Sequence, residues 1–247
     1  MTEPIEAGAL YVVSTPIGNL EDITRRAVHI LGGVALVAAE DTRTTRVLLS
    51  HLGLRTPMLS YHSHNELRRI PEILARLQSG QAVALVTDAG TPGISDPAFR
   101  VLRAAIDSGC RIIPIPGASA ALAALVASGL PMDRFVFEGF LPLKKGRQRR
   151  LQELALESRT VVLYEAPHRI TSTLEDLQRA VGERSVAVGR ELTKKFEEVV
   201  RGTVREVLEH FQKSRPRGEM VIVLEGAGRR KRSAEVLEEP ASVEPDP

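Results

Sequence analysis

The sequence has a single cysteine, Cys110, and no tryptophan among its 247 residues. One cysteine excludes an intramolecular disulfide and a cysteine-based metal cluster, and it fits a reducing cytoplasm. Aromatic residues make up only 4% of the chain. The sequence therefore shows no aromatic platform on which the bases of single-stranded RNA would stack.

The chain also lacks a long apolar run and a marked excess of either charge. No stretch reaches the roughly 18 consecutive apolar residues that a membrane span needs. The first residues, MTEPIEAGAL, are acidic and unlike a signal peptide, so we expect a cytoplasmic protein without a membrane anchor. Lysine and arginine number 33 against 31 acidic residues. Any surface that binds nucleic acid must therefore be local.

The sequence does contain an alternation of short apolar runs and amphipathic helical patterns, in an ordinary globular composition of 43% hydrophobic and 26% charged residues. In the first half, the apolar runs that predict buried strands are 9–13, 34–38, 58–61, 82–87 and 111–115. The helical patterns cover 23–31, 44–52, 66–77 and 97–108. We expect Asp96 to cap the last helix, with Pro97 in its first turn. This order predicts a parallel sheet with crossover helices.

The second half repeats the alternation with one difference. Its predicted strands are 134–138, 160–165, 185–189, 197–202 and 220–224, and its predicted helices are 119–128, 148–157, 171–181 and 204–212. Two of these strands follow each other without a helix, which indicates a mixed sheet. We therefore expect two α/β domains, an N-terminal one over 1–117 and a C-terminal one over 118–228. The charged, proline-containing segment 229–247 is predicted to be a disordered tail.

Polar or glycine-rich loops follow all five predicted strands of the first half, at 14–20, 40–43, 62–66, 88–93 and 116–119. Ligands of open parallel sheets bind outside the carboxyl ends of the strands. Ordinary turn chemistry explains any single loop, but five loops at one sheet edge favour a ligand site. The loop after Asp88 is the sharpest signal, because Gly90 and Gly93 let a backbone approach a ligand closely. No GxGxxG follows a strand and no GxxxxGK[ST] occurs, which disfavours NAD and ATP.

Several of these loops lie in longer motifs. TPIGNLEDITRRA (15–27), AEDTRTTRVLL (39–49), VTDAGTPGISDP (86–97) and PIPGASA (114–120) resemble the tetrapyrrole methylase superfamily. FVFEGFLPLKKGRQR (135–149), YEAPHRI (164–170) and GRELTKKFEEVVRG (189–202) are similar to one branch of it, the ribosomal RNA small subunit methyltransferase I family. The resemblance runs from about Leu10 to Glu225, nearly the whole of the predicted domains.

This resemblance implies a fold, a cofactor and a reaction. The family has two α/β domains with S-adenosylmethionine in the cleft between them, usually forms a homodimer, and 2′-O-methylates a cytidine ribose in the decoding centre of 16S ribosomal RNA. Carried onto this chain, the residues implied in cofactor binding are Pro16, Asp88, Ala89, Gly90, Thr91, Ile94, Ser119, Ala120, Leu163 and Tyr164. The carboxylate of Asp88 would favour a cationic sulfonium or accept a hydrogen bond from a ligand hydroxyl.

Methyl transfer to a hydroxyl needs positioning, exclusion of water and a group that accepts a proton or stabilises the attacking oxygen, and it requires no metal. Four groups of polar residues are candidates: Glu40, Asp41 and Arg43; His62, His64 and Glu66; Glu165, His168 and Arg169; Arg190, Glu191 and Lys194. We predict substrate-side roles for Asp41, Arg43, Glu165 and Lys194. A desolvated lysine can act as a base.

Structural alternatives remain open for these groups. Residues 40–42 fit an acidic helix N-terminus, and Arg190 with Glu191 fits an ion pair. His62 and His64 would share one face of a strand and offer two metal ligands, although a polar loop end is the preferred interpretation.

A basic run, Lys144, Lys145, Arg147, Arg149 and Arg150, follows the predicted strand near Phe135. We predict that it contacts phosphates of 16S ribosomal RNA or of the 30S subunit, with Arg43 and Arg46 as additions. The alternative is a solvated helix start. The basic residues at 229–232 carry less weight, because acidic residues follow them.

Three other functions compete with this prediction. A tetrapyrrole C-methylase would share the fold and the cofactor, but the APHR and RELTKKFEE motifs and the basic run argue against it. A non-catalytic ribosome-binding protein would keep the fold without the cofactor. A nucleotide-dependent oxidoreductase would need the glycine fingerprint that is missing here.

Overall fold

The structure, a computed structural model, describes residues 4–213 and 217–228. It divides into two compact units: the first holds Met1–Ala120 with Thr193–Lys195, and the second holds Ala121–Leu192 with Phe196–Pro247. The predicted tail at 229–247 lies outside the described residues. Each unit is an α/β layer structure with its own core.

The first unit contains a five-stranded, wholly parallel sheet in the order β3-β2-β4-β1-β5. Its elements are β1 (Leu10–Val13), a short 3-10 helix (Leu20–Asp22), α1 (Arg25–Gly33), β2 (Leu36–Ala39), α2 (Thr42–His51), β3 (Met58–Ser60), α3 (Glu66–Gln78), β4 (Val83–Val86), α4 (Phe99–Asp107) and β5 (Ile112–Ile115). The predicted parallel sheet is confirmed.

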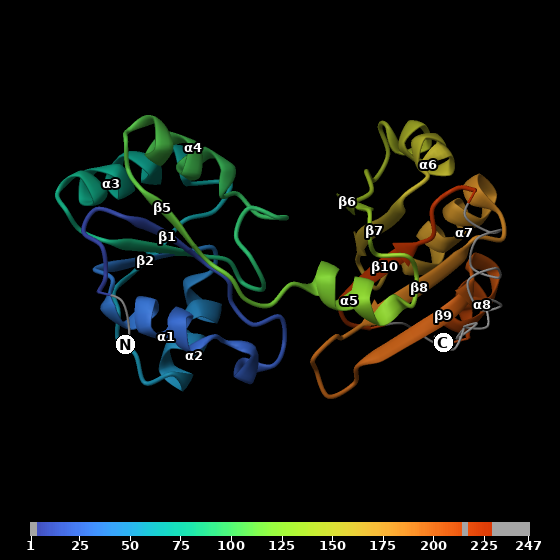
Figure 1. Cartoon of the computed structure of the whole chain (residues 1–247), viewed down its shortest axis with the longest axis horizontal. Helices are drawn as coiled ribbons and strands as arrows, with labels where there is room; N and C mark the ends of the chain where they lie inside the picture. The colour runs from blue at the N-terminus through green and yellow to red at the C-terminus, as the bar shows by residue number, and fades with distance from the viewer. Residues whose placement is uncertain (1–3, 214–216, 229–247) are drawn as a thin grey trace, which may run out of the picture. The chain divides into compact units, whose positions relative to one another are not determined.

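Alternating side chains of the buried strands face two separate helical layers. Tyr11 and Val13 of β1 pack with α1 and α2 in one core cluster. Leu10, from the same strand, packs with α3 and α4 in another. The period of two along each strand thus produces a sheet covered on both faces, which is why its strands read as continuous apolar runs. Figure 1 shows the two helix pairs on opposite sides of the sheet.

The second unit contains the mixed sheet that the sequence predicted, in the order β6-β7-β10-β8-β9. Only β6 and β7 are parallel, and the other three pairs are antiparallel. Its elements are α5 (Ala120–Ser128), β6 (Phe135–Phe140), α6 (Arg147–Leu156), β7 (Thr160–Glu165), α7 (Ile170–Val181), β8 (Ser185–Arg190), β9 (Glu198–Thr203), α8 (Val204–Gln212) and β10 (Met220–Leu224). Helices α6, α7 and α8 supply the large core on one face of this sheet.

One local prediction was wrong, and one local alternative is excluded. The residue before α4 is Ala98, which makes no side-chain capping bond. Asp96 instead accepts a hydrogen bond from the Gly93 amide at 2.7 Å and closes the preceding turn. Strand β3 ends at Ser60, so His62 and His64 lie in a loop. This confirms the preferred interpretation of a polar loop end, and the alternative of a shared strand face does not occur.

Candidate functional site

Strands β4 and β1 are adjacent interior strands of the first unit's sheet, and the candidate site lies at their carboxyl ends. The two strands are neighbours and parallel. The chain leaves β1 toward α1 on one face and leaves β4 toward α4 on the other. Neighbouring strands whose connections diverge in this way open the sheet edge to a ligand. The site therefore begins at residues 14–18 and 87–93.

Three loops meet at this edge. The amide of Thr15 donates to the Gly90 carbonyl at 2.9 Å, and the Gly90 amide donates back at 3.1 Å. The hydroxyls of Ser14 and Thr91 lie 2.8 Å apart. A Cβ on Gly90 would lie 3.7 Å from the carbonyl oxygen of Ala118. The loops after β1, β4 and β5 thus form one surface, which we call the strand-end site.

Glycine is required at three points of this surface. Gly90 has a φ of +82° and Gly93 a φ of +91°, a region that other residues enter only with strain. Gly117 passes so close to Ser14 that an added Cβ would lie 2.8 Å from the Ser14 Cβ. These glycines let peptide groups of separate loops approach one another closely.

Carboxylates gather beside the strand-end site. The Thr87 hydroxyl donates to Glu40 at 2.5 Å, and the Asp41 amide donates to Asp88 at 3.1 Å. Burial raises the pKa of Asp88, and the neighbouring Glu40 carboxylate raises it further. Burial also raises the pKa of Asp96. A cluster whose negative charge is poorly compensated favours a cationic ligand.

The residues that the sequence predicted for the cofactor fall into two sets. Pro16, Asp88, Ala89, Gly90, Thr91, Ile94, Ser119 and Ala120 lie in the first unit, on the loops that form or border the strand-end site. Leu163 and Tyr164 lie in the second unit, on β7.

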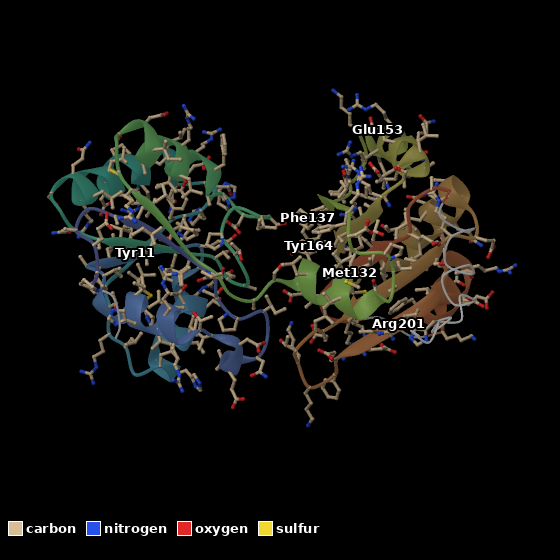
Figure 2. All side chains as sticks on the ribbon, viewed as in Figure 1. Tyr11, Met132, Phe137, Glu153, Tyr164 and Arg201 are labelled. Carbon is tan, nitrogen blue, oxygen red and sulfur yellow. The ribbon has the colours of Figure 1, made fainter. Side chains whose placement is uncertain are left out.

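Leu163 and Tyr164 point to opposite faces of their sheet. Leu163 is part of the core formed with α6, α7 and α8. Tyr164 is half-buried and packs edge-to-face against Phe137, with ring centroids 5.0 Å apart (Figure 2). Burial raises the pKa of the Tyr164 phenol. Of the two side chains, only that of Tyr164 is available to a ligand, and Leu163 has only its backbone to offer.

Asp41 and Arg43 form a local pair at the start of α2. Asp41 caps the helix by accepting from the Arg43 amide at 2.8 Å, and its carboxylate pairs with the Arg43 guanidinium at 2.6 Å. These bonds to Arg43 lower the pKa of Asp41 to about 2. The helix-capping alternative for Asp41 is therefore realised, while the Arg43 side chain remains 88% exposed to solvent.

The histidine loop is organised by Asn65. Its side-chain amide bonds to the Ser60 carbonyl at 3.1 Å and accepts from the His62 amide at 2.9 Å. Glu66 pairs with Arg100 at 3.3 Å. Among the described residues, no group of three or more His, Cys, Asp and Glu side chains is arranged to hold a metal ion.

Glu165 is the most enclosed of the predicted substrate-side residues. Its side chain is 1% exposed. It accepts hydrogen bonds from the Thr173 hydroxyl at 2.6 Å and the Ala166 amide at 2.8 Å, and it pairs with Arg169 at 3.3 Å. These contacts engage both carboxylate oxygens of Glu165 within the second unit, which favours a structural role over the substrate-side role that the sequence predicted.

Lys194 lies in the connection between β8 and β9, in a segment with unusual backbone conformations. Glu191 and Thr193 both have positive φ, at 51° and 68°. The Glu191 amide donates to the Glu219 carbonyl, and the Glu219 amide donates to the Glu191 carboxylate, both at 3.0 Å. Strained residues held by such reciprocal bonds are frequent at functional sites.

Gly218, which lies just before β10, is the residue beside this segment that sequence reasoning missed. A Cβ at this position would overlap the Glu191 carboxylate. The signal was invisible because Gly218 and Glu191 are distant in sequence and come from separate connections of the second unit. Arg190 forms an ion pair with Glu198 at 2.8 Å, whereas the alternative that the sequence offered was a pair with Glu191.

The five residues of the basic run differ in their contacts and exposure. Arg147 and Arg150 are held by ion pairs within the second unit. Arg147, whose side chain is 12% exposed, pairs with Asp176 at 2.7 Å, and Arg150, whose side chain is 45% exposed, pairs with Glu138 and Glu153. Arg149 lies 3.6 Å from Glu153 with 82% of its side chain exposed. Lys144 and Lys145 are exposed. Arg147 therefore has a structural role that the charge pattern alone did not indicate.

Comparisons with known proteins agree with this geometry. Residues 9–208 match the family described as Tetrapyrrole (Corrin/Porphyrin) Methylases. The chain is 55% identical over 222 residues to the ribosomal RNA small subunit methyltransferase I of Synechocystis sp., covering 89% of this chain and 80% of that protein. It is 47% identical over 223 residues to the protein of the same name from Haemophilus influenzae, covering 89% and 79%.

Solved structures show the same fold at much lower identity. The methyltransferase CobJ has a TM-score of 0.68 at 20% identity, covering 90% of this chain and 95% of that one. The uroporphyrin-III C-methyl transferase from Thermus thermophilus, complexed with S-adenyl homocysteine, has a TM-score of 0.62 at 18% identity, covering 87% and 96%. Within residues 4–213 and 217–228, none of the helices has the length and apolar character needed to cross a membrane.

Proposed function

Because the chain belongs to the ribosomal RNA small subunit methyltransferase I branch of the tetrapyrrole methylases, we propose that it transfers the methyl group of S-adenosylmethionine to a ribose 2′-hydroxyl of 16S ribosomal RNA, at a cytidine of the decoding centre. The observation that carries this proposal is the strand-end site. Three loops from distant parts of the sequence meet there beside a raised-pKa carboxylate. We place the reaction in the cytoplasm, where ribosomal subunits occur.

The strand-end site has polar groups that are suited to binding the cofactor. The hydroxyls of Ser14 and Thr91, which lie 2.8 Å apart, can hydrogen-bond the polar parts of an amino acid or a nucleoside. The Asp88 carboxylate supplies negative charge for a sulfonium. When bound, S-adenosylmethionine supplies an already activated methyl group, so the protein contributes mainly position and exclusion of water.

The remaining cofactor residues are assigned on the family resemblance. Pro16, Ala89, Ile94, Ser119 and Ala120 would border the same cofactor in the first unit. Leu163 through its backbone and Tyr164 through its ring would contribute from the second unit.

Substrate-side roles follow from exposure. Arg43 presents a guanidinium that Asp41 holds by an ion pair, an arrangement suited to one RNA phosphate. Lys194 is assigned to the attacking 2′-oxygen, either accepting its proton or stabilising its developing charge. Glu191 and Thr193, which precede Lys194, both have positive φ. Their backbone conformation sets the path of the chain into Lys194.

The RNA backbone would be held by exposed cations. Lys144, Lys145 and Arg149 of the basic run, with Arg43 and Arg46 of α2, are exposed. Each phosphate that such a group neutralises adds to the salt dependence of binding. The partner is 16S ribosomal RNA, free or within the 30S subunit.

A homodimer is proposed on the second unit's apolar surface. Leu122 and Val126 of α5 are 52% and 64% exposed, and Phe140 at the end of edge strand β6 is 53% exposed. Leu122 and Val126 are four residues apart and so share one face of α5, and contiguous exposed apolar surface commonly marks a protein interface. Light scattering on the purified protein should give twice the monomer mass, and the Val126→Glu variant should give the monomer mass.

The function is tested by transfer of a tritiated methyl group from S-adenosylmethionine. Radioactivity should enter 30S subunits or 16S ribosomal RNA as a 2′-O-methylcytidine, and the Asp88→Asn variant should transfer little. Label entering a porphyrinogen instead would identify a tetrapyrrole C-methylase. Absence of any heat of S-adenosylmethionine binding in calorimetry would leave only a non-catalytic binding protein.

A further inference from the structure

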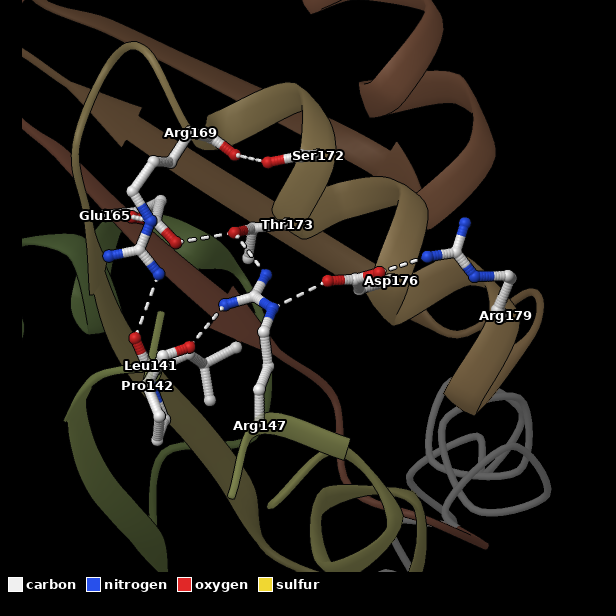
Figure 3. Close-up of polar contacts among 9 residues, drawn as sticks. All are labelled: Leu141, Pro142, Arg147, Glu165, Arg169, Ser172, Thr173, Asp176 and Arg179. Atoms are coloured by element: carbon white, nitrogen blue, oxygen red, sulfur yellow. Dashed lines mark hydrogen bonds and ion pairs between the residues drawn. The ribbon is translucent and has the colours of Figure 1, made fainter. Parts of the chain in front are cut away.

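A buried polar network joins β7, α7 and the segment after β6 within the second unit (Figure 3). At its centre, Glu165 accepts from Thr173 and pairs with Arg169. The Thr173 hydroxyl also accepts a hydrogen bond from Arg147 at 2.9 Å. One hydroxyl thus links two arginines, and each arginine has a carboxylate partner: Glu165 for Arg169, and Asp176 for Arg147.

Both arginines also donate to backbone carbonyls of one short segment. Arg169 donates to the Leu141 carbonyl at 2.9 Å, and Arg147 donates to the Pro142 carbonyl at 3.2 Å. The two side chains are 16% and 12% exposed. We call this set of Arg147, Glu165, Arg169, Thr173 and Asp176 the arginine clamp.

The clamp holds the backbone immediately before an exposed tip. Leu143 is 73% exposed, and Lys144 and Lys145 follow it into solvent. Gly146, with a φ of +84°, then turns the chain into α6. The tip is therefore fixed on one side by two charge-assisted hydrogen bonds to carbonyls and on the other side by a helix start.

We propose that the arginine clamp is a positioning device that presents Lys144 and Lys145 as a preformed site for the phosphate backbone of RNA. This inference rests on the proposed function for the identity of the polyanion. It reassigns Arg147 and Glu165 from ligand contacts to positioning residues, and it adds Arg169, Thr173 and Asp176. Preorganisation raises affinity by removing the entropy cost of ordering the tip on binding.

The chain offers a matched control for Arg147. Arg179 also pairs with Asp176, from the next turn of α7, but it is 68% exposed and has no described contact with residues 141–145. Arg147→Gln and Arg179→Gln each remove one arginine from the same carboxylate. Only the first removes a hydrogen bond to the segment that carries the tip.

Limited proteolysis measures, in the absence of RNA, how readily the segment that carries the tip opens. Trypsin cleavage after Lys144 or Lys145 requires local opening of the segment. We expect Arg147→Gln to accelerate this cleavage about tenfold and Arg179→Gln to change it less than about twofold, since native-state cleavage follows the opening equilibrium. The charge-preserving Arg147→Lys variant should cleave at an intermediate rate, because a lysine cannot replace the planar fork.

Binding to a 16S ribosomal RNA transcript at several salt concentrations separates positioning from direct contact. The double variant Lys144→Gln with Lys145→Gln should reduce the slope of log affinity against log salt by about 1.4, at about 0.7 per phosphate contact on single-stranded RNA. Arg147→Gln should weaken binding about fivefold with an unchanged slope, as expected when only preorganisation is lost.

Two results would overturn the inference. A reduced slope for Arg147→Gln would make Arg147 a phosphate contact, and equal cleavage of Arg147→Gln and Arg179→Gln would remove its positioning role. If Arg147→Gln does not fold, the Arg147→Lys variant carries the same comparison. Failure to methylate ribosomal RNA would refute the proposed function and leave the proteolysis result intact, so the two failures are distinguishable.

Discussion

The strand-end site and the arginine clamp differ in whether neighbouring groups compensate the charge of their carboxylates. In the first, Asp88 has a carboxylate neighbour, Glu40, and its pKa is raised. In the second, Glu165 is buried with an arginine and a hydroxyl on its oxygens. Uncompensated charge costs stability and is retained where a ligand supplies the compensation, whereas compensated buried charge fixes geometry. The comparison assigns binding to the first region and positioning to the second.

The largest expected effect is on stability, in the clamp. Glu165→Ala removes the carboxylate that pairs with Arg169, and the Arg169 side chain is then left largely buried without that partner. Breaking such a pair from one side costs about 3–5 kcal/mol. Urea denaturation followed by circular dichroism should show this loss, and Asp107→Ala, which breaks an exposed pair on α4, should lose less than about 1 kcal/mol. Equal losses in the two variants would contradict the structural role of Glu165 in the clamp.

The next effect is on cofactor binding, at the strand-end site. Asp88→Asn removes the charge that faces the sulfonium and should weaken S-adenosylmethionine binding at least tenfold, which calorimetry measures. Because the pKa of Asp88 is raised in the folded protein, its ionised form is a net cost to folding at neutral pH. The thermal midpoint without ligand should therefore stay level or rise. A lower midpoint would indicate a structural carboxylate like Glu165.

A smaller effect is expected on turnover, at the segment that carries Lys194. Gly218→Ala displaces Glu191 and should lower kcat about tenfold while leaving S-adenosylmethionine binding unchanged. Gly129→Ala is the matched control, since Gly129 also has positive φ but an added Cβ would meet nothing within 4 Å. Both variants should lose about 1–2 kcal/mol from backbone strain, so an equal loss of kcat in both would deny Glu191 a positioning role.

The smallest effect is a pH dependence of cofactor affinity. Burial raises the pKa of both Asp88 and Asp96, so these carboxylates ionise at higher pH than usual. Affinity for S-adenosylmethionine should rise as the pH passes through the raised pKa values, and Asp88→Asn should flatten the rise. Asp41, with a pKa of about 2, contributes nothing above pH 4. An affinity that falls with rising pH over this range would contradict the electrostatic role of the cluster.

The fold was largely predictable because strand periodicity and helix signals are local. The continuous apolar run at 82–87 predicted a strand buried on both faces, and β4 is such a strand. The missing helix between 189 and 197 predicted the antiparallel pair β8 and β9. Asp96 was misread, since an aspartate before a proline can close a turn as readily as it can cap a helix.

The site was only partly predictable, because its contacts join distant residues. The convergence of the loops could be predicted from the parallel topology of the sheet. The contact between Ser14 and Thr91 could not be predicted from local sequence, because 77 residues separate them. Arg147 looked like one cation among five. Its burial against Asp176 and Thr173 depends on how α6 packs on α7, which a charge pattern does not encode.

Ribose-methylation mapping of 16S ribosomal RNA tests the central claim most directly. RNA would be taken from cells lacking this protein and from the same cells supplied with the unmodified chain or with Asp88→Asn. The account predicts one decoding-centre cytidine that loses its 2′-O-methyl group, regains it with the unmodified chain, and stays unmethylated with the variant. Full methylation of that ribose in cells without the protein would contradict it.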